Sequence, residues 1–342
     1  MILGASGNIG REIVSAFQTY NTGNPSSTFK ITILTREASY NRTLAQFPPS
    51  SDIQVVPISS YTDATALTSL LQKNNIQVLI STIATFSTKD QQTIVNACVA
   101  AGTVQRFVPS EYGVDTSNIE LITKHLPPAL LKNEVVSYLR QVSADTNGQL
   151  TWSAIIVGTF FDWGLLLPGV MSYDVPKMSA TVFDGGDVKY EGTNVGQIAR
   201  AVVACLATPE AFEATTNEYV YVNSFTTTQN EVIGLIEKFT GRTMQHTPVS
   251  STDLGRKARE TMEAMGGLEA YRAYEPTPEA PYAPGSVEAI WSCLYGGNAT
   301  GGLNQYSLRE PGLWNARLGL PKEKIEETVR GVVANLGMLK DE

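Results

Sequence analysis

The chain has 342 residues, a formal net charge of −8 and 42% hydrophobic residues, enough for one large domain or two smaller ones with an ample core. Its acidic balance and its lack of a lysine or arginine cluster disfavour nucleic acid and anionic membranes as partners. The sequence contains no apolar run near the ~18 residues that cross a bilayer, and no charged leader with an apolar stretch behind it, so neither a membrane span nor a secretory signal is predicted.

Cysteine and histidine usage narrows the class further. The three cysteines are odd in number and widely spaced, which predicts reduced, buried thiols and a cytoplasmic location. The only two histidines, His125 and His246, lie far apart without ligand-like spacing, so no metal site is predicted. The sequence also has no Gly-x-Ser-x-Gly elbow of the kind that supports a hydrolase.

Glycines recur at every third position near the start of the chain, at Gly4, Gly7 and Gly10. A dinucleotide-binding turn needs glycine for the sharp bend, for the approach of the pyrophosphate and for helix packing, and the amides of the following helix face the phosphates. A plain strand-to-helix connection is the alternative interpretation. The predicted cofactor contacts on this loop are Gly4, Ser6, Gly7, Asn8, Ile9 and Gly10.

The strand before this turn is short. Only Met1, Ile2 and Leu3 precede Gly4, whereas a buried strand usually runs ~5 or 6 residues. We expect this strand either to continue upstream of Met1 or to be truncated.

A second strand is predicted at 30–34 and is followed by Thr35, Arg36 and Glu37. At this strand end an acidic residue would accept from the ribose of NAD, whereas an arginine would accommodate the phosphate of NADP. Arg36 therefore predicts NADPH as cofactor. A solvated surface arginine is the alternative, and the neighbouring Glu37 keeps NAD open.

Strand and helix patterns alternate through the first half of the chain. Strands are predicted at 53–58, 78–83, 105–108 and 151–157, and helices at 64–73, 90–101 and 129–142. This alternation predicts an α/β fold with a Rossmann-type, doubly wound parallel sheet covered on both faces, which binds its ligands at the carboxyl ends of the strands.

The rhythm changes after residue 157. A loop-rich stretch is predicted at 158–187, then a helix at 195–207 and a strand at 218–223 that we assign to the main sheet, then helices at 229–240, 251–265 and 322–336. Prolines in 275–284 and glycines in 296–302 predict loops, which are candidates for a lid. The predicted domains are a Rossmann domain of 1–157 plus 189–224 and a smaller, mainly helical substrate-binding part of 158–188 plus 225–342.

The run RFVPSEYGVD at 106–115 resembles the RF(I/L/V)PSEFG signature of the isoflavone reductase-like group, within the NmrA-like atypical short-chain dehydrogenases. Asp90-Gln91 and the apolar residues after it resemble the DQ helix of that group, and the glycine turn resembles its cofactor loop. Weaker similarity continues at 192–196 and 226–241, and the stretch 158–163 is similar to fungal members. Tyr112 departs from the usual phenylalanine, and 21–29 lengthens the link before the second strand.

The resemblance implies an NADPH-dependent reductase of a conjugated or aromatic small molecule, acting on a carbonyl, enone or benzylic carbon in secondary or aromatic metabolism. It also implies a lysine as general acid or base on the helix after the PSE motif, and Lys132 is the matching position. Burial can lower the pKa of such a lysine toward neutrality. Lys124 and Lys89 are the rivals, and an ordinary exposed helix lysine is the alternative for Lys132.

Residues after other strand ends complete the predicted site. Ser81, Thr82, Gly158, Thr159 and Phe160 are placed to meet the cofactor. The predicted substrate contacts are Ser110, Glu111, Tyr112, Phe161 and Trp163. Alternatively, Ser110 caps a turn and Glu111 forms an ion pair. In the alternative interpretation the aromatic residues belong to the core.

Two other functions stay open on the same scaffold. One is a non-catalytic, NAD(P)-sensing regulator of the nitrogen-metabolite-repressor type, which binds a protein partner. The other is an isomerase or cyclase that uses the same pocket. A homo-oligomer also stays open.

Overall fold

A computed structural model describes residues 1–26, 28–83, 88–275, 277, 280, 282–296, 304–308 and 310–340, without the side chains of 88 and 89. The chain forms two compact units, one of 1–111, 131–155 and 198–220 and the other of 112–130, 156–197 and 221–342. The domain boundaries expected from the sequence remain a prediction, and the compact units place 112–130 and 189–197 in the second unit. Within the described residues, no helix is both long and apolar enough to cross a membrane.

The first unit is built on a seven-stranded parallel sheet with the strand order β11-β6-β5-β4-β1-β2-β3. Its strands are β1 Ile2–Leu3, β2 Ile31–Arg36, β3 Ile53–Ile58, β4 Val78–Ser81, β5 Arg106–Val108, β6 Thr151–Ile156 and β11 Glu218–Tyr221. The order runs outward from β1 in both directions, as in a Rossmann fold, so the strand order reverses between β1 and β4. The predicted fold class and the return of the strand at 218–223 to the main sheet are both confirmed.

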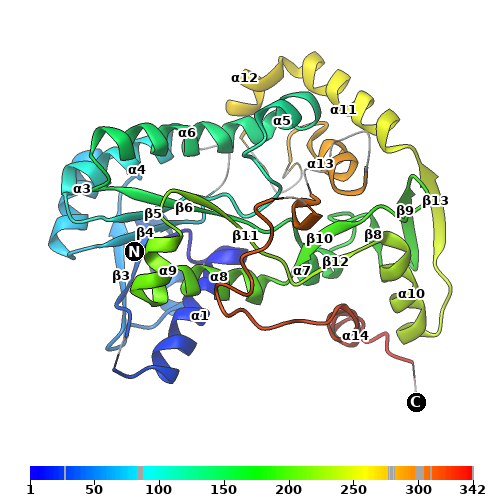
Figure 1. Ribbon diagram of the computed structural model, residues 1–342, viewed down its shortest axis with the longest axis horizontal. Helices are drawn as coiled ribbons and strands as arrows, with labels where there is room; N and C mark the ends of the chain where they lie inside the picture. Colours follow the sequence, from blue (N-terminus) through cyan, green and yellow to red (C-terminus); the bar gives the residue numbers. More distant parts are fainter. Residues whose placement is uncertain are drawn as a thin grey trace. The chain divides into compact units, whose positions relative to one another are not determined.

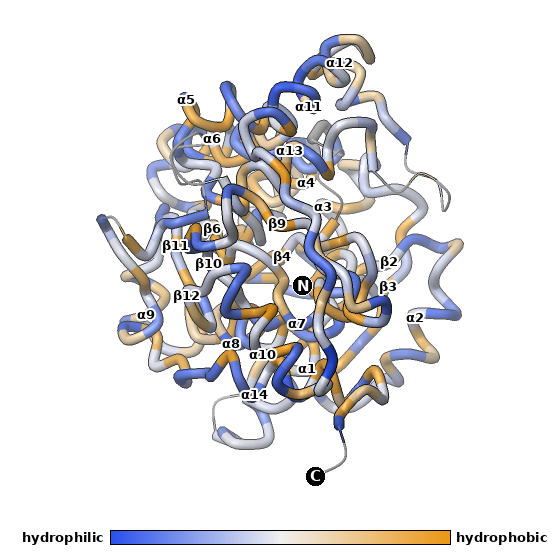
Figure 2. Tube along the Cα trace, turned by 90° about the vertical axis from the view of Figure 1, so that its right-hand side faces the viewer, coloured by the Kyte–Doolittle hydropathy of each residue, from blue (hydrophilic) through white to orange (hydrophobic). Residues whose placement is uncertain are grey.

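Helices cover both faces of this sheet: α3, α4 and α6 lie on one face and α1 and α8 on the other (Figure 1). The helices are α1 Asn8–Gly23, α2 Tyr40–Gln46, α3 Ala64–Lys73, α4 Thr88–Ala101, α6 Leu130–Asp145, α8 Val195–Ala207 and α9 Pro209–Ala214, with a short 3-10 turn at Glu37–Ser39. Hydrophobic and hydrophilic residues alternate along α1 (Figure 2), and Ile9, Ile13 and Phe17 form its buried stripe.

The second unit holds two three-stranded sheets, β12-β10-β7 and β13-β9-β8. Its strands are β7 Thr159–Phe160, β8 Tyr173–Asp174, β9 Ser179–Phe183, β10 Tyr190–Thr193, β12 Phe225–Thr227 and β13 Gln245–Val249. Its helices are α5 Ile119–His125, α7 Phe161–Leu166, α10 Gln229–Thr240, α11 Ser251–Met265, α12 Gly267–Arg272, α13 Ser286–Tyr295 and α14 Ile325–Asn335, with 3-10 turns at Pro127–Ala129 and Tyr306–Leu308. Helix α10 packs against α14, and α11 against α13 (Figure 1).

The prediction of a loop-rich stretch at 158–187 is wrong, because β7, α7, β8 and β9 lie there. The reason is their length: strands of two to five residues are too short to show a clear period of two. The predicted loops at 275–284 and 296–302 lie partly outside the described residues.

A buried arginine links two neighbouring strands of the main sheet to a helix. Arg106 in β5 is 0% exposed; its guanidinium donates to the hydroxyls of Thr151 and Ser153 in β6 at 2.8 and 2.7 Å and to the Phe212 carbonyl in α9 at 2.8 Å. Burial lowers the pKa of this guanidinium to about 10, so it stays charged at neutral pH. Hydrogen bonds to neutral acceptors therefore hold this charge between two strands and a helix.

We predict that Arg106→Met lowers the free energy of unfolding by about 3 kcal/mol or more, because each charged hydrogen bond contributes ~1.5 to 3 kcal/mol. Urea denaturation measures the loss. Arg140→Met is the matched control: Arg140 is exposed, with its guanidinium 5.5 Å from the Trp152 ring, so its replacement costs less than about 1 kcal/mol. Equal losses for the two variants would contradict the role of Arg106.

Candidate functional site

The glycine turn connects β1 to α1 at the carboxyl edge of the sheet. The Gly7 amide donates to the Gly4 carbonyl at 2.9 Å, and the Arg11 amide donates to the Gly7 carbonyl at 3.2 Å, which starts the helix. Gly7 occupies the N-cap position and provides no side-chain cap. The first amides of α1 are therefore available to an anionic ligand such as a pyrophosphate.

Close backbone packing explains two of the three glycines. Gly4 has a φ of +78°, and a Cβ there would lie 2.8 Å from the Thr82 carbonyl oxygen. A Cβ on Gly10 would overlap the Gly4 carbonyl oxygen and lie 2.7 Å from the Ala5 Cα. Gly7 itself is exposed, and its position leaves room for a ligand to approach the backbone.

A cavity of about 320 Å³ opens beside this turn. Gly4 and Gly7 line it together with Arg36 at the end of β2, and so do Arg42 of α2 and Tyr61, which follows β3. The Arg42 guanidinium donates to the Ser39 hydroxyl at 3.4 Å, and Ser39 lies on the same wall. Two guanidinium groups thus border the space at the carboxyl end of β2, which suits a phosphate ester.

The other predicted cofactor contacts on the glycine turn and at the end of β4 lie in different surroundings. Ser6 and Asn8 are exposed, whereas Ile9 is 8% exposed and belongs to the buried face of α1. Thr82 lines the cavity, and its hydroxyl donates to the Leu3 carbonyl at 2.7 Å. Ser81 is fully buried, and its hydroxyl donates to the Gln91 side chain at 3.3 Å. It therefore connects the end of β4 to α4 and does not line the cavity.

Lys132 and Glu111 meet in the first unit. Lys132 lies in the first turn of α6, and its ammonium donates to the backbone carbonyl of Glu111, three residues beyond the end of β5 in the PSE motif. Burial lowers the pKa of Lys132 below the usual 10.5, and the negative charge of Glu111 opposes this shift. Lys132 is half-buried, so the site contains a partly accessible amine held by a carbonyl, which is a suitable arrangement for moving a proton.

Neighbouring positions of the motif are also constrained. Glu111 is 1% exposed and Ser110 is half-buried. Tyr112 is buried and adopts a φ of +24°, a conformation that costs free energy for any residue with a Cβ. Lys124, the rival lysine, is exposed at the end of α5, and the side chain of Lys89 lies outside the described residues.

The segment after β6 belongs to the second unit. Gly158 has a φ of +66°, and Thr159 and Phe160 form β7, which pairs with Gly192 and Thr193 of β10. Phe160 and Trp163 are partly exposed, and their rings lie edge to face at 6.2 Å.

Phe161, one of the aromatic residues predicted to contact the substrate, lies in the core, and so does Tyr271. Phe161 is 0% exposed and packs edge to face on Phe225 at 4.7 Å. Tyr271 is likewise 0% exposed, and its hydroxyl donates to the Pro284 carbonyl. Of these rings, only Phe160 and Trp163 remain suited to contact a ligand.

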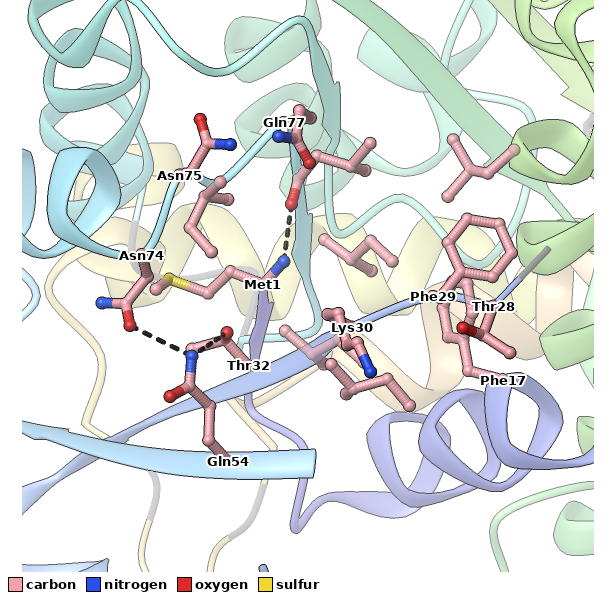
Figure 3. Close-up of a pocket in the computed structure, with 16 residues that line it drawn as sticks. Met1, Phe17, Thr28, Phe29, Lys30, Thr32, Gln54, Asn74, Asn75 and Gln77 are labelled. Atoms are coloured by element: carbon pink, nitrogen blue, oxygen red, sulfur yellow. Dashed lines mark hydrogen bonds between the residues drawn. The ribbon is translucent and has the colours of Figure 1, made fainter. Parts of the chain in front are cut away.

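A second cavity, of about 290 Å³, lies at the opposite, amino-terminal ends of β1, β2 and β4. The Met1 amino group donates to the Val78 carbonyl at 2.6 Å. Figure 3 shows Gln54 bonded to Thr32 and Asn74. Burial lowers the pKa of the Met1 amine to about 5. Because this cavity is separated from the glycine turn by the length of the strands, it has no part in the site.

Residues 1–276 match the NmrA-like family. The chain belongs to the NmrA-like family. It is 32% identical to the oxidoreductase aprR of Aspergillus flavus over 70% of this chain and 73% of that one, and 25% identical to the isoflavone reductase homolog IRL of Zea mays over 76% and 80%.

Solved structures agree with the fold of an NmrA-like protein. The leucoanthocyanidin reductase of Vitis vinifera, in a ternary complex, superimposes with a TM-score of 0.70 at 19% identity over 97% of this chain and 98% of that one. The same enzyme in its binary complex with NADPH gives a TM-score of 0.69 over the same shares.

Sequence reasoning missed Arg42, Ser39 and Tyr61 of this NmrA-like chain. Tyr61 follows the carboxyl end of β3, so the rule that selected Arg36 after β2 could have found it. Arg42 lies in a seven-residue helix with no strong apolar period, and only the folded position of α2 reveals it.

We predict that Arg36→Ala and Arg42→Ala each weaken NADPH binding by roughly one to two powers of ten while sparing NADH, since a charged contact contributes ~1.5 to 3 kcal/mol. Isothermal titration calorimetry with both nucleotides measures the effect. Lys30→Ala is the control, because Lys30 is exposed, precedes β2 and pairs with Asp52 at 2.9 Å. An equal loss for NADPH and NADH would refute a phosphate contact.

Proposed function

We propose that this protein is an NADPH-dependent oxidoreductase that reduces a conjugated or aromatic small molecule. The observation that carries the proposal is the cavity that joins the glycine turn to Arg36 and Arg42. The oxidoreductase name of aprR and the NADPH bound to the leucoanthocyanidin reductase support it.

The residues of the cavity fit the two phosphate-bearing parts of NADPH. The turn at Gly4–Gly7 and the uncapped start of α1 would hold the pyrophosphate. Arg36 and Arg42 would hold the ribose phosphate, and Glu37, the residue that favours NAD, does not line the cavity. Tyr61 offers an aromatic ring on the same wall. When bound, the cofactor supplies a hydride.

Lys132 would supply the matching proton in this scheme. The Glu111 carbonyl fixes the position of its ammonium group, and burial makes the proton easier to release than from an exposed lysine. A half-buried lysine with a lowered pKa can donate a proton to an oxygen as negative charge develops there. Ser110 and Tyr112 flank this position in the chain and remain candidates for substrate contact.

The substrate class rests on Gly158–Phe160 and Trp163. We propose that Gly158, Thr159 and Phe160 contact the nicotinamide and that Phe160 and Trp163 contact the substrate. Partly exposed aromatic rings favour flat, conjugated molecules by ~0.5 to 1.5 kcal/mol per ring pair beyond area burial. Incubation of the protein with NADPH and a panel of aromatic aldehydes, enones, benzylic ethers and short aliphatic ketones, read by mass spectrometry, tests this choice. Faster reduction of an aliphatic ketone than of every aromatic compound would contradict it.

We predict that Lys132→Met lowers turnover by ~10²- to 10⁴-fold and leaves NADPH affinity nearly unchanged, as expected for loss of a general acid. Because the donor must be protonated, turnover of the native protein falls as pH rises through the pKa of Lys132, which lies below 10.5. Steady-state rates from pH 6 to 10 measure both effects.

Lys124→Met is the control for this experiment, since Lys124 is an exposed helix residue. It should keep the rate and the pH profile of the native protein. Full activity of Lys132→Met would refute the general-acid role of this residue. Binding of NADPH without turnover of any substrate in the panel would instead favour the non-catalytic sensor.

A further inference from the structure

A buried carboxylate in the second unit has no assigned role. Glu191 lies in β10 and is 0% exposed. Its Oε2 accepts from the Asn223 amide at 2.7 Å and from the Thr226 hydroxyl at 2.8 Å. Its Oε1 accepts from the Ser307 backbone amide at 3.3 Å and also from the Ser307 hydroxyl. Burying a carboxylate is costly, and here neutral donors offset that cost.

These donors come from parts of the chain far apart in sequence. Asn223 lies two residues before β12 and Thr226 lies within it, whereas Ser307 belongs to the 3-10 turn Tyr306–Leu308. That turn lies beyond residue 276, the last residue that matches the family. Tyr306 secures the same turn, because its hydroxyl donates to the Val222 carbonyl at 2.8 Å. Glu191 thus fixes a C-terminal segment, 304–308, on β10.

The backbone of Glu191 connects this segment to the residues after β6. Its amide donates to the Asn304 carbonyl at 3.0 Å, and its carbonyl accepts from the Thr159 hydroxyl at 3.0 Å and from the Asn304 side-chain amide at 3.3 Å. A Cβ on Gly158 would lie 2.6 Å from Asn304 Oδ1 and equally close to the Glu191 carbonyl. Gly158 and Thr159 therefore rest directly on Glu191 and Asn304.

We propose that Glu191 is a positioning residue for the nicotinamide end of the site: it holds segment 304–308 in place, and both together fix the backbone at Gly158–Phe160. The inference rests on the proposed function, in which Gly158–Phe160 contact the nicotinamide. It gives the C-terminal part of this chain a direct role in the geometry of its own cofactor site.

The carboxylate is essential to this arrangement for a chemical reason. Each of its oxygens faces a nitrogen that can only donate, the Ser307 amide on one side and the Asn223 side-chain amide on the other. A glutamine of the same shape would place its own NH₂ against one of these donors in either orientation. Glu191→Gln therefore breaks the contact without changing the volume of the side chain.

The experiment compares two ligands, NADPH and adenosine 2′,5′-bisphosphate, which carries the ribose phosphate but no nicotinamide. Glu191→Gln should lower the affinity for NADPH by about tenfold, the effect of one lost charged hydrogen bond. The affinity for the bisphosphate should stay unchanged. Ser307→Ala keeps the backbone donor and should show a smaller loss of NADPH affinity in the same direction. Glu231→Gln, an exposed carboxylate of the same unit, is the control and should bind both ligands as the native protein does.

Calorimetric melting confirms that each variant is folded. An unchanged NADPH affinity in folded Glu191→Gln, or an equal loss for both ligands, would overturn the positioning role while leaving the proposed function intact. Failure of the native protein to bind either ligand would instead refute the proposed function.

Discussion

The close contact between the backbone of Gly4, Gly10 and Thr82 is the constraint on which the rest of the site depends. Gly4 and Gly10 have no room for a side-chain carbon, so β1, the start of α1 and the end of β4 meet at van der Waals distance. At the same turn, Gly7 occupies the N-cap position without a capping side chain, so the first amides of α1 are uncapped at the point where the strand order reverses. Arg36 at the end of β2 and Arg42 in α2 line the same cavity. The packing around the glycine turn therefore places a helix terminus beside two cationic side chains.

Arg106, Lys132 and Glu191 are charged groups held by hydrogen bonds, and each has a different role in the structure. Arg106 is bound by hydroxyls and a carbonyl and holds β5, β6 and α9 together. Lys132 donates to the Glu111 carbonyl, and its ammonium is the proposed source of the proton. Glu191 is bound by amides and hydroxyls and orders a segment from the end of the chain. In each case hydrogen bonds to neutral groups hold a charge whose desolvation would otherwise oppose folding. These residues combine structural order with the chemistry proposed for the site.

Much of the fold could be predicted from local patterns. The helices at 64–73, 195–207, 229–240 and 251–265 begin and end where expected, because side-chain caps such as Asp63, Thr228 and Ser250 and the left-handed glycines Gly241 and Gly266 are local signals. The two-residue strands β7 and β8 carry no such signal. The carbonyl that holds Lys132 and the wall formed by Arg42 depend on tertiary placement, which periodicity does not contain. Phe161 follows a strand end, a position that predicts a substrate contact, but its packing against Phe225 buries it.

We propose that NADPH binds at the carboxyl edge of the sheet, across the glycine turn and the two arginines. Amide hydrogen exchange of the native protein with and without NADPH, read by mass spectrometry, tests it most directly. We expect slower exchange in peptides that contain residues 4–10, 36–43 and 82. Unchanged exchange in these peptides, or protection confined to the opposite cavity around Met1 and Gln77, would contradict it.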